Sequence, residues 1–102
     1  MKRYEILLPL VYNNGKKIEK EKFYIANQEL VKKFEATTTD TIIATGSWVY
    51  KGVLYEDKLL RIRIDTEETK KSKDFFKKYK EVLKKRFKQY DIWITSYEIE
   101  VI

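Results

Sequence analysis

The chain has 102 residues and a net charge of +6, from 22 Lys or Arg against 16 Asp or Glu. It contains no histidine and no cysteine, which excludes disulfides, thiolate chemistry, catalytic triads and the usual zinc sites. At 43% hydrophobic and 37% charged residues it is typical of one folded domain, residues 1–102, and its longest apolar run, Ile6–Tyr12, is too short to cross a membrane.

The first half of the chain predicts a strand, a helix and a second strand. Tyr4–Tyr12 is apolar and rich in β-formers, and it ends at the turn signal Asn13-Asn14-Gly15. From Glu19 to Glu35 apolar residues recur at helical spacing, with lysine and glutamate between them. The stretch Thr41–Tyr50 is a predicted strand that leads into a turn at Lys51-Gly52.

The second half predicts a strand, a long helix and a last strand. Val53–Asp65 is a predicted strand whose final residues alternate between apolar and charged. Asp65 or Thr66 is placed to cap the next helix, with Glu68 completing a capping box. The apolar stripe of that helix consists of Phe75, Phe76, Tyr79, Val82, Leu83, Phe87 and Tyr90. The last strand runs from about Ile92 to Val101.

The order β-α-β-β-α-β is that of the ferredoxin-like arrangement. We therefore predict a single α+β domain in which both helices cover one face of a four-stranded antiparallel sheet. The other face of the sheet is left open to solvent or to a partner.

The long helix has a basic face. Residues 67–89 hold ten Lys or Arg against four Asp or Glu, which is the whole net surplus of the chain. The favoured interpretation is a solvated face that keeps a small domain soluble. The alternative is a nucleic-acid surface with Lys77, Lys80 and Lys84 as anion contacts, although no aromatic or glycine residue is interleaved with these lysines.

Arg86 falls inside the apolar sector of the same helix. A guanidinium there needs a carboxylate, and the candidates on neighbouring strands are Asp57, Asp91 and Glu98. We predict a structural ion pair between Asp57 and Arg86 in preference to an anion anchor.

Aromatic and arginine side chains gather on the predicted open face. The candidates are Trp48, Tyr50, Tyr55, Arg61, Arg63, Trp93 and Tyr97. Burial in a homo-oligomer is the first interpretation, since Trp, Tyr and Arg are favoured interface anchors. Stacking of single-stranded RNA comes second, and is weakened because the third strand, VLYEDKLLRIRID, lacks the RNA-recognition octapeptide. A small-ligand pocket under the hairpin of residues 45–53 comes third. A shift of one residue in strand phase would turn the whole set inward.

Carboxylates leave a further alternative, an enzyme acting on a small anion. The adjacent pair Glu56-Asp57 points to opposite faces of a strand, so the two cannot act on one atom. No glycine-rich phosphate loop is present. The sequence therefore assigns no catalytic residue, no metal and no cofactor.

Three short motifs carry a family resemblance: Gly46-x-Trp48, Gly52-x-x-Tyr55-Glu56-Asp57 and Arg86-Phe87-x-Gln89. In this order the chain resembles a family of small uncharacterised ferredoxin-like proteins whose bacterial members include lipoproteins and secreted proteins. The resemblance implies the fold and implies that no activity is established. Unlike the lipoprotein members, this sequence has neither a signal nor a lipid-bearing cysteine, which favours a cytoplasmic role.

From the sequence we thus expect a non-catalytic binding or assembly module, without membrane partners, that forms a dimer or higher oligomer through its sheet. The expected contact residues are Trp48, Tyr50, Tyr55, Arg61, Trp93 and Tyr97. The abundance of lysine and glutamate, without cysteine, also resembles thermophile compositions.

Overall fold

Six elements make up the computed structural model, which describes the backbone of residues 1–67 and 69–102 and the side chains of these residues outside 41–46 and 55–57. They are β1 (Lys2–Pro9), α1 (Lys20–Phe34), β2 (Thr38–Tyr50), β3 (Val53–Thr66), α2 (Lys70–Arg86) and β4 (Trp93–Glu98). The strands form one sheet in the order β2-β3-β1-β4, and all three pairings are antiparallel. The predicted α+β class, with two helices and a four-stranded antiparallel sheet, is confirmed.

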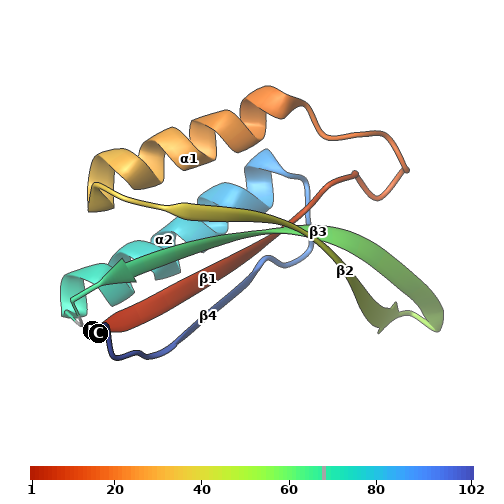
Figure 1. Cartoon of the computed structure of the whole chain (residues 1–102). Helices are drawn as coiled ribbons and strands as arrows, with labels where there is room; N and C mark the ends of the chain where they lie inside the picture. The colour runs from red at the N-terminus through yellow and green to blue at the C-terminus, as the bar shows by residue number, and fades with distance from the viewer. Residues whose placement is uncertain (68) are drawn as a thin grey trace.

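The core lies between the sheet and the two helices, which both lie on the same side of it (Figure 1). Strand β1 alternates from Arg3 to Leu8, where Tyr4, Ile6 and Leu8 are buried, and Pro9 at its end is buried as well. Their neighbours on β3, Ile62 and Ile64, are buried with them. The matching helix residues are Ala26 and Leu30 of α1 and Phe76, Tyr79 and Leu83 of α2. The strand phase is thereby fixed, with the even-numbered residues of β1 and β3 turned inward.

The second helix begins later than the sequence predicts. Strand β3 continues to Thr66, so Asp65 is a strand residue opposite Arg3 and caps nothing. The cap is Thr69, whose Oγ1 accepts a hydrogen bond from the Ser72 N–H at 3.0 Å. The predicted capping-box residue, Glu68, lies outside the described residues.

The same helix also ends earlier than its predicted stripe. Phe87 is its C-cap, and Lys88 then adopts a left-handed backbone with φ of 52°. Tyr90 therefore lies beyond the helix and is 63% exposed, and Val82 is exposed on the helix itself. Neither belongs to the core.

A long hairpin projects from the body of the molecule. The last pair between β1 and β3 is Pro9 with Leu59, and the Leu10 N–H donates to the Lys58 carbonyl at 3.0 Å. Beyond this point the strand pairs of residues 46–50 and 53–57 are with each other. This hairpin extends away from both helices (Figure 1), and the molecule measures 41 × 27 × 24 Å. Its exposed apolar residues are Val49, Tyr50, Val53 and Leu54.

In the part of the chain that the structure describes, neither helix combines the length and the hydrophobicity that a membrane crossing needs.

Candidate functional site

The open face of the sheet carries the odd-numbered residues of β1 and β3. Strand pairing places Leu7 between Arg61 on β3 and Trp93 on β4, and it places Arg3 between Asp65 and Tyr97. Since residues directly opposite each other on paired strands share a face, these side chains all lie on the side away from the helices. The sequence-predicted residues Arg61, Trp93 and Tyr97 are thus brought together on one surface.

One half of this open face is a set of ion pairs. Arg3 holds Asp65 through two parallel hydrogen bonds of 2.7 and 3.0 Å, which lower the pKa of the Asp65 carboxyl and raise that of the guanidinium. Asp40 accepts from Arg61 Nη2 at 2.8 Å and lies 3.0 Å from Arg63 Nη2. The hydrogen bond from Arg61 is the main reason that the pKa of Asp40 is lowered.

Two arginines therefore share one carboxylate. In the described part of the structure, the Nε atoms of Arg61 and Arg63 are buried without a hydrogen-bond partner. Beside them the Tyr97 hydroxyl donates to Glu5 Oε1 at 2.9 Å. Charges on this half are balanced, with Arg3, Arg61 and Arg63 facing Glu5, Asp40 and Asp65.

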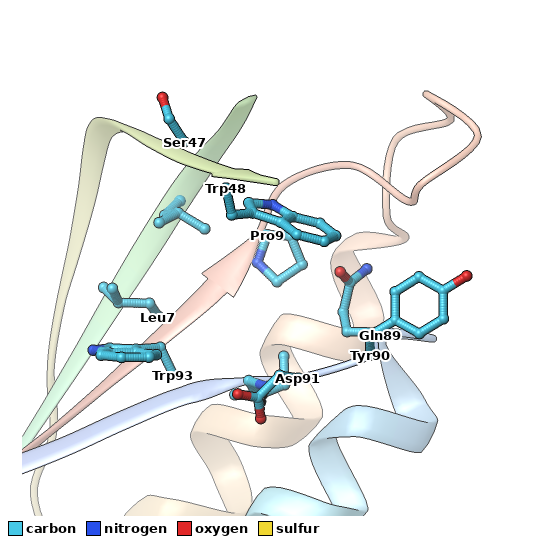
Figure 2. Close-up of a pocket in the computed structure, with 10 residues that line it drawn as sticks. Leu7, Pro9, Ser47, Trp48, Gln89, Tyr90, Asp91 and Trp93 are labelled. Carbon is cyan, nitrogen blue, oxygen red and sulfur yellow. Dashed lines mark hydrogen bonds between the residues drawn. The ribbon is translucent and has the colours of Figure 1, made fainter. Parts of the chain in front are cut away.

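The other half of the open face ends in a pocket of about 440 Å³. It lies where β1 and β4 meet the projecting hairpin and the α2–β4 connection (Figure 2). Its described lining residues are Leu7, Pro9, Ser47, Trp48, Leu59, Gln89, Tyr90, Asp91, Ile92 and Trp93.

The hairpin is braced against the α2–β4 connection by aromatic rings. Tyr50 stacks on Tyr90 with ring centres 4.9 Å apart, and Trp48 lies 6.3 Å from Tyr50. Trp48 and Trp93 thus line the same pocket, and Tyr50 lies between Trp48 and Tyr90. The side chain of Tyr55 lies outside the described residues.

The partner of Arg86 that the structure describes is Glu29 of α1, which was not among the partners expected from the sequence. The guanidinium binds both carboxylate oxygens, with Nη2 to Oε2 at 3.1 Å, and Tyr79 Oη donates to Oε1 at 3.0 Å. The carboxylate partners expected from the sequence lay on neighbouring strands, whereas the packing of the two helices brings α1 next to this face of α2. The side chain of Asp57 lies outside the described residues.

The three candidate anion contacts on α2 differ in their surroundings. Lys80 Nζ lies 3.0 Å from Asp91 Oδ1, and Lys84 Nζ lies 3.5 Å from Glu81 Oε2. Lys77 is exposed on the side of the helix away from the core. Two of the three lysines thus already have a carboxylate beside them, which leaves this helix face poorly built for phosphate.

Four carboxylates of the described residues have shifted pKa values. The pKa values of Glu19, Glu29, Asp40 and Asp65 are all lowered, each mainly by a hydrogen bond from a neighbouring side chain. The described residues also contain no cluster of three or more His, Cys, Asp or Glu placed to hold a metal ion.

Several residues of the site were not predicted from the sequence. Asp40 precedes the predicted start of its strand, and Gln89 and Tyr90 follow a helix that was predicted to include Tyr90. The turn at Lys88 moves these last two residues from the helical stripe to the pocket. The one available signal was that Gln89 lies in the Arg86-Phe87-x-Gln89 motif.

No protein-family model matches the chain, and no curated protein matches it in sequence. Its fold is similar to that of solved structures. A phage SAM lyase in complex with S-methyl-5'-thioadenosine superposes with a TM-score of 0.68 at 13% identity, covering 95% of this chain and 80% of the lyase. The divalent cation tolerance protein CutA1 from Thermus thermophilus superposes with a TM-score of 0.63 at 20% identity, covering 97% and 84%.

A second CutA1, from Pyrococcus horikoshii, has a TM-score of 0.62 at 14% identity and covers 100% of this chain and 86% of its own. These neighbours share a ferredoxin-like fold. At such low identity the similarity extends to the fold alone.

Proposed function

We propose that the protein is a ferredoxin-like assembly module of the cytoplasm that binds a second copy of itself through the open face of its sheet. The observation that carries this proposal is the exposure of large aromatic residues on β4. Trp93 is 63% exposed and Tyr97 is 44% exposed, on a face that no helix covers. Exposed aromatic surface of this kind marks an interaction site more often than a bare monomer surface.

The charge on the open face favours a second copy over a polyanion. The molecule carries +6 overall, so most approaches of two copies are repulsive. On the open face, however, Arg3, Arg61 and Arg63 are balanced by three carboxylates. Two copies can therefore meet there without net repulsion, whereas nucleic-acid phosphates would find no surplus positive charge.

The two edges of the sheet also support self-association. Strands β2 and β4 are the outer strands and so present unpaired backbone groups. The projecting hairpin adds Tyr50 and Val53, which are exposed, pair with each other and share the phase of the open face. A second copy that covers the face would also shield these residues from water.

Light scattering coupled to size exclusion tests the proposal. We expect a dimer or higher oligomer at low salt that persists at high salt, because its interface is aromatic and charge-balanced. Tyr97→Ala and Trp93→Ala should each shift the mass toward the monomer. The matched control is Tyr24→Ala on α1, a residue 65% exposed and outside the sheet, which should leave the mass unchanged.

A wild-type monomer across the accessible concentration range would contradict self-association. An oligomer that is unaffected by both β4 variants would show that another surface is used. The resemblance to the uncharacterised family remains a hypothesis beside this one, since no finding tests it.

A further inference from the structure

The pocket at the end of the open face has the size of a small-molecule site. We propose that it binds a flat, uncharged aromatic molecule that carries an N–H donor at its edge. Its volume of about 440 Å³ lies within the range typical of ligand pockets. The pocket shares Trp93 with the surface proposed for self-association, whereas Tyr97 belongs to that surface and does not line the pocket, so Tyr97→Ala separates the two proposals.

Aromatic and apolar side chains form the walls. In Figure 2 the indole of Trp48 lies on one side of the cavity and that of Trp93 on the other, with Leu7 and Pro9 along the wall between them. Leu59 and Ile92 complete the apolar lining. Indole rings in the wall favour a flat aromatic guest, because a flat ring that stacks on an indole contacts more of its atoms than a rounded group does.

Charge in the pocket is already compensated. Among the described lining residues the charged one is Asp91. Its Oδ1 lies 3.0 Å from Lys80 Nζ and accepts a hydrogen bond from the Ile92 N–H at 2.9 Å. A charged guest would give up hydration without meeting an uncompensated opposite charge, so an uncharged guest is favoured.

Gln89 supplies an oriented acceptor. Its Nε2 donates to the Phe87 carbonyl at 2.9 Å, which fixes the amide, and its own N–H donates to the Lys84 carbonyl at 3.0 Å. Figure 2 shows the amide oxygen turned toward the cavity and the nitrogen away from it. An acceptor held in this way selects a guest that has a donor at its rim.

The chain offers a direct readout, because Trp48 and Trp93 are its only tryptophans. In a 15N-correlated NMR spectrum their two indole N–H signals report on the walls of the pocket. The probes are indole, benzofuran and cyclohexanol: a flat ring with a donor, a flat ring of the same shape without one, and a donor without a flat ring. We expect indole to shift both signals saturably and to bind about fivefold more tightly than benzofuran, as one hydrogen bond implies. Cyclohexanol should shift neither signal.

Two variants decide whether the assigned residues act as proposed. Gln89→Met keeps the length of the side chain and removes the acceptor, so the preference for indole over benzofuran should disappear. Trp48→Ala should weaken both aromatic probes, with the Trp93 signal showing that the protein remains folded. If Trp48→Ala unfolds the hairpin, the preference for indole over benzofuran in Gln89→Met still tests the proposal.

Three results would overturn the proposal: no shift at millimolar indole, equal shifts with cyclohexanol, or an unchanged indole preference in Gln89→Met. If dilution of the protein moves the indole signals while indole does not, the pocket is filled by a second copy and the proposal is likewise wrong. Tyr97→Ala, placed at the other end of β4, should alter the oligomer and leave indole binding intact.

Discussion

Arg86 is a charged residue in a helix sector that otherwise faces the core. Its guanidinium is compensated by Glu29, so the pair joins the two helices across their contact. The hydrogen bonds from Arg86 are the main reason that the pKa of Glu29 is lowered from its usual 4.5. Burial, in turn, is the main reason that the pKa of the adjacent Tyr79 is raised. The network joins the two helices and lies away from the open face.

Replacing Arg86 by Met should destabilise the fold by about 1–2 kcal/mol at pH 7, between the values for exposed and buried pairs. The folded-state pKa of Glu29 lies below 4.5, so the stabilisation is fully present above that pH. It is lost as the pH falls through the lower folded-state value. Wild type should therefore lose more stability than Arg86→Met below pH 4.5, as measured by urea unfolding over a pH series.

The neighbouring exposed residue Lys85 provides the control, since Lys85→Met should change stability by no more than about 0.5 kcal/mol. Asp40 and Asp65 also have lowered pKa values, but they keep their arginines in both proteins. Their effect cancels in the comparison. Parallel stability curves for wild type and Arg86→Met would show that the pair does not set the acid response.

The projecting hairpin depends on its two-residue turn. Lys51 and Gly52 both have positive φ, 50° and 77°, as a type I′ turn requires. Lysine is strained in that region, whereas asparagine tolerates it. Lys51→Asn should therefore stabilise the hairpin, and Gly52→Ala should destabilise it by about 1 kcal/mol. Hydrogen exchange of the hairpin amides should slow in the first variant and accelerate in the second.

Backbone strain, and not crowding, is the reason that Gly52→Ala should destabilise the hairpin, since a Cβ at Gly52 would meet no atom within 4 Å. Gly15→Ala is a matched control. It has a φ of 85° and equally open surroundings, but it lies in the loop after β1. In Gly15→Ala the amides of the β2–β3 hairpin should exchange as in wild type. Similar acceleration in both glycine variants would indicate global destabilisation instead.

Elements with strict alternation were predictable, and elements that depend on long-range packing were not. The alternation of Leu60–Asp65 predicted a half-buried strand, and the burial of Ile62 and Ile64 in the structure then decided which face turns inward. The start of α2 was misplaced, since Asp65 is a good cap by type but is held in the sheet by Arg3. The end of α2 was misplaced because the left-handed turn at Lys88 has no glycine to signal it.

The candidate site also depends on long-range packing that the sequence does not show. Trp48 and Trp93 were candidates for the open face whose strand phase the sequence left undecided, and their meeting with Gln89 and Tyr90 could not be predicted. That meeting depends on how far the hairpin bends toward the α2–β4 connection, where Tyr50 stacks on Tyr90. Neither periodicity nor composition specifies such a contact.

Across the whole molecule, charge and aromatic surface are separated. The surplus of +6 lies in residues 67–89, on the helical side, whereas the open face is balanced. Two surfaces of different character thus lie on opposite sides of one sheet. An interaction through α2 must be sensitive to salt, and one through the open face need not be.

The double substitution of Lys77 and Lys84 by Gln separates the two surfaces. It lowers the net charge from +6 to +4 and leaves Lys80 beside Asp91, so the pocket is undisturbed. If assembly uses the open face, the mass from light scattering should be unchanged at low and high salt. A labelled single-stranded oligonucleotide, followed by fluorescence anisotropy, should bind weakly and similarly to both proteins. Steeply salt-dependent binding that the double variant abolishes would instead make α2 the functional surface, because affinity for phosphates falls with each lysine removed and with each counterion added.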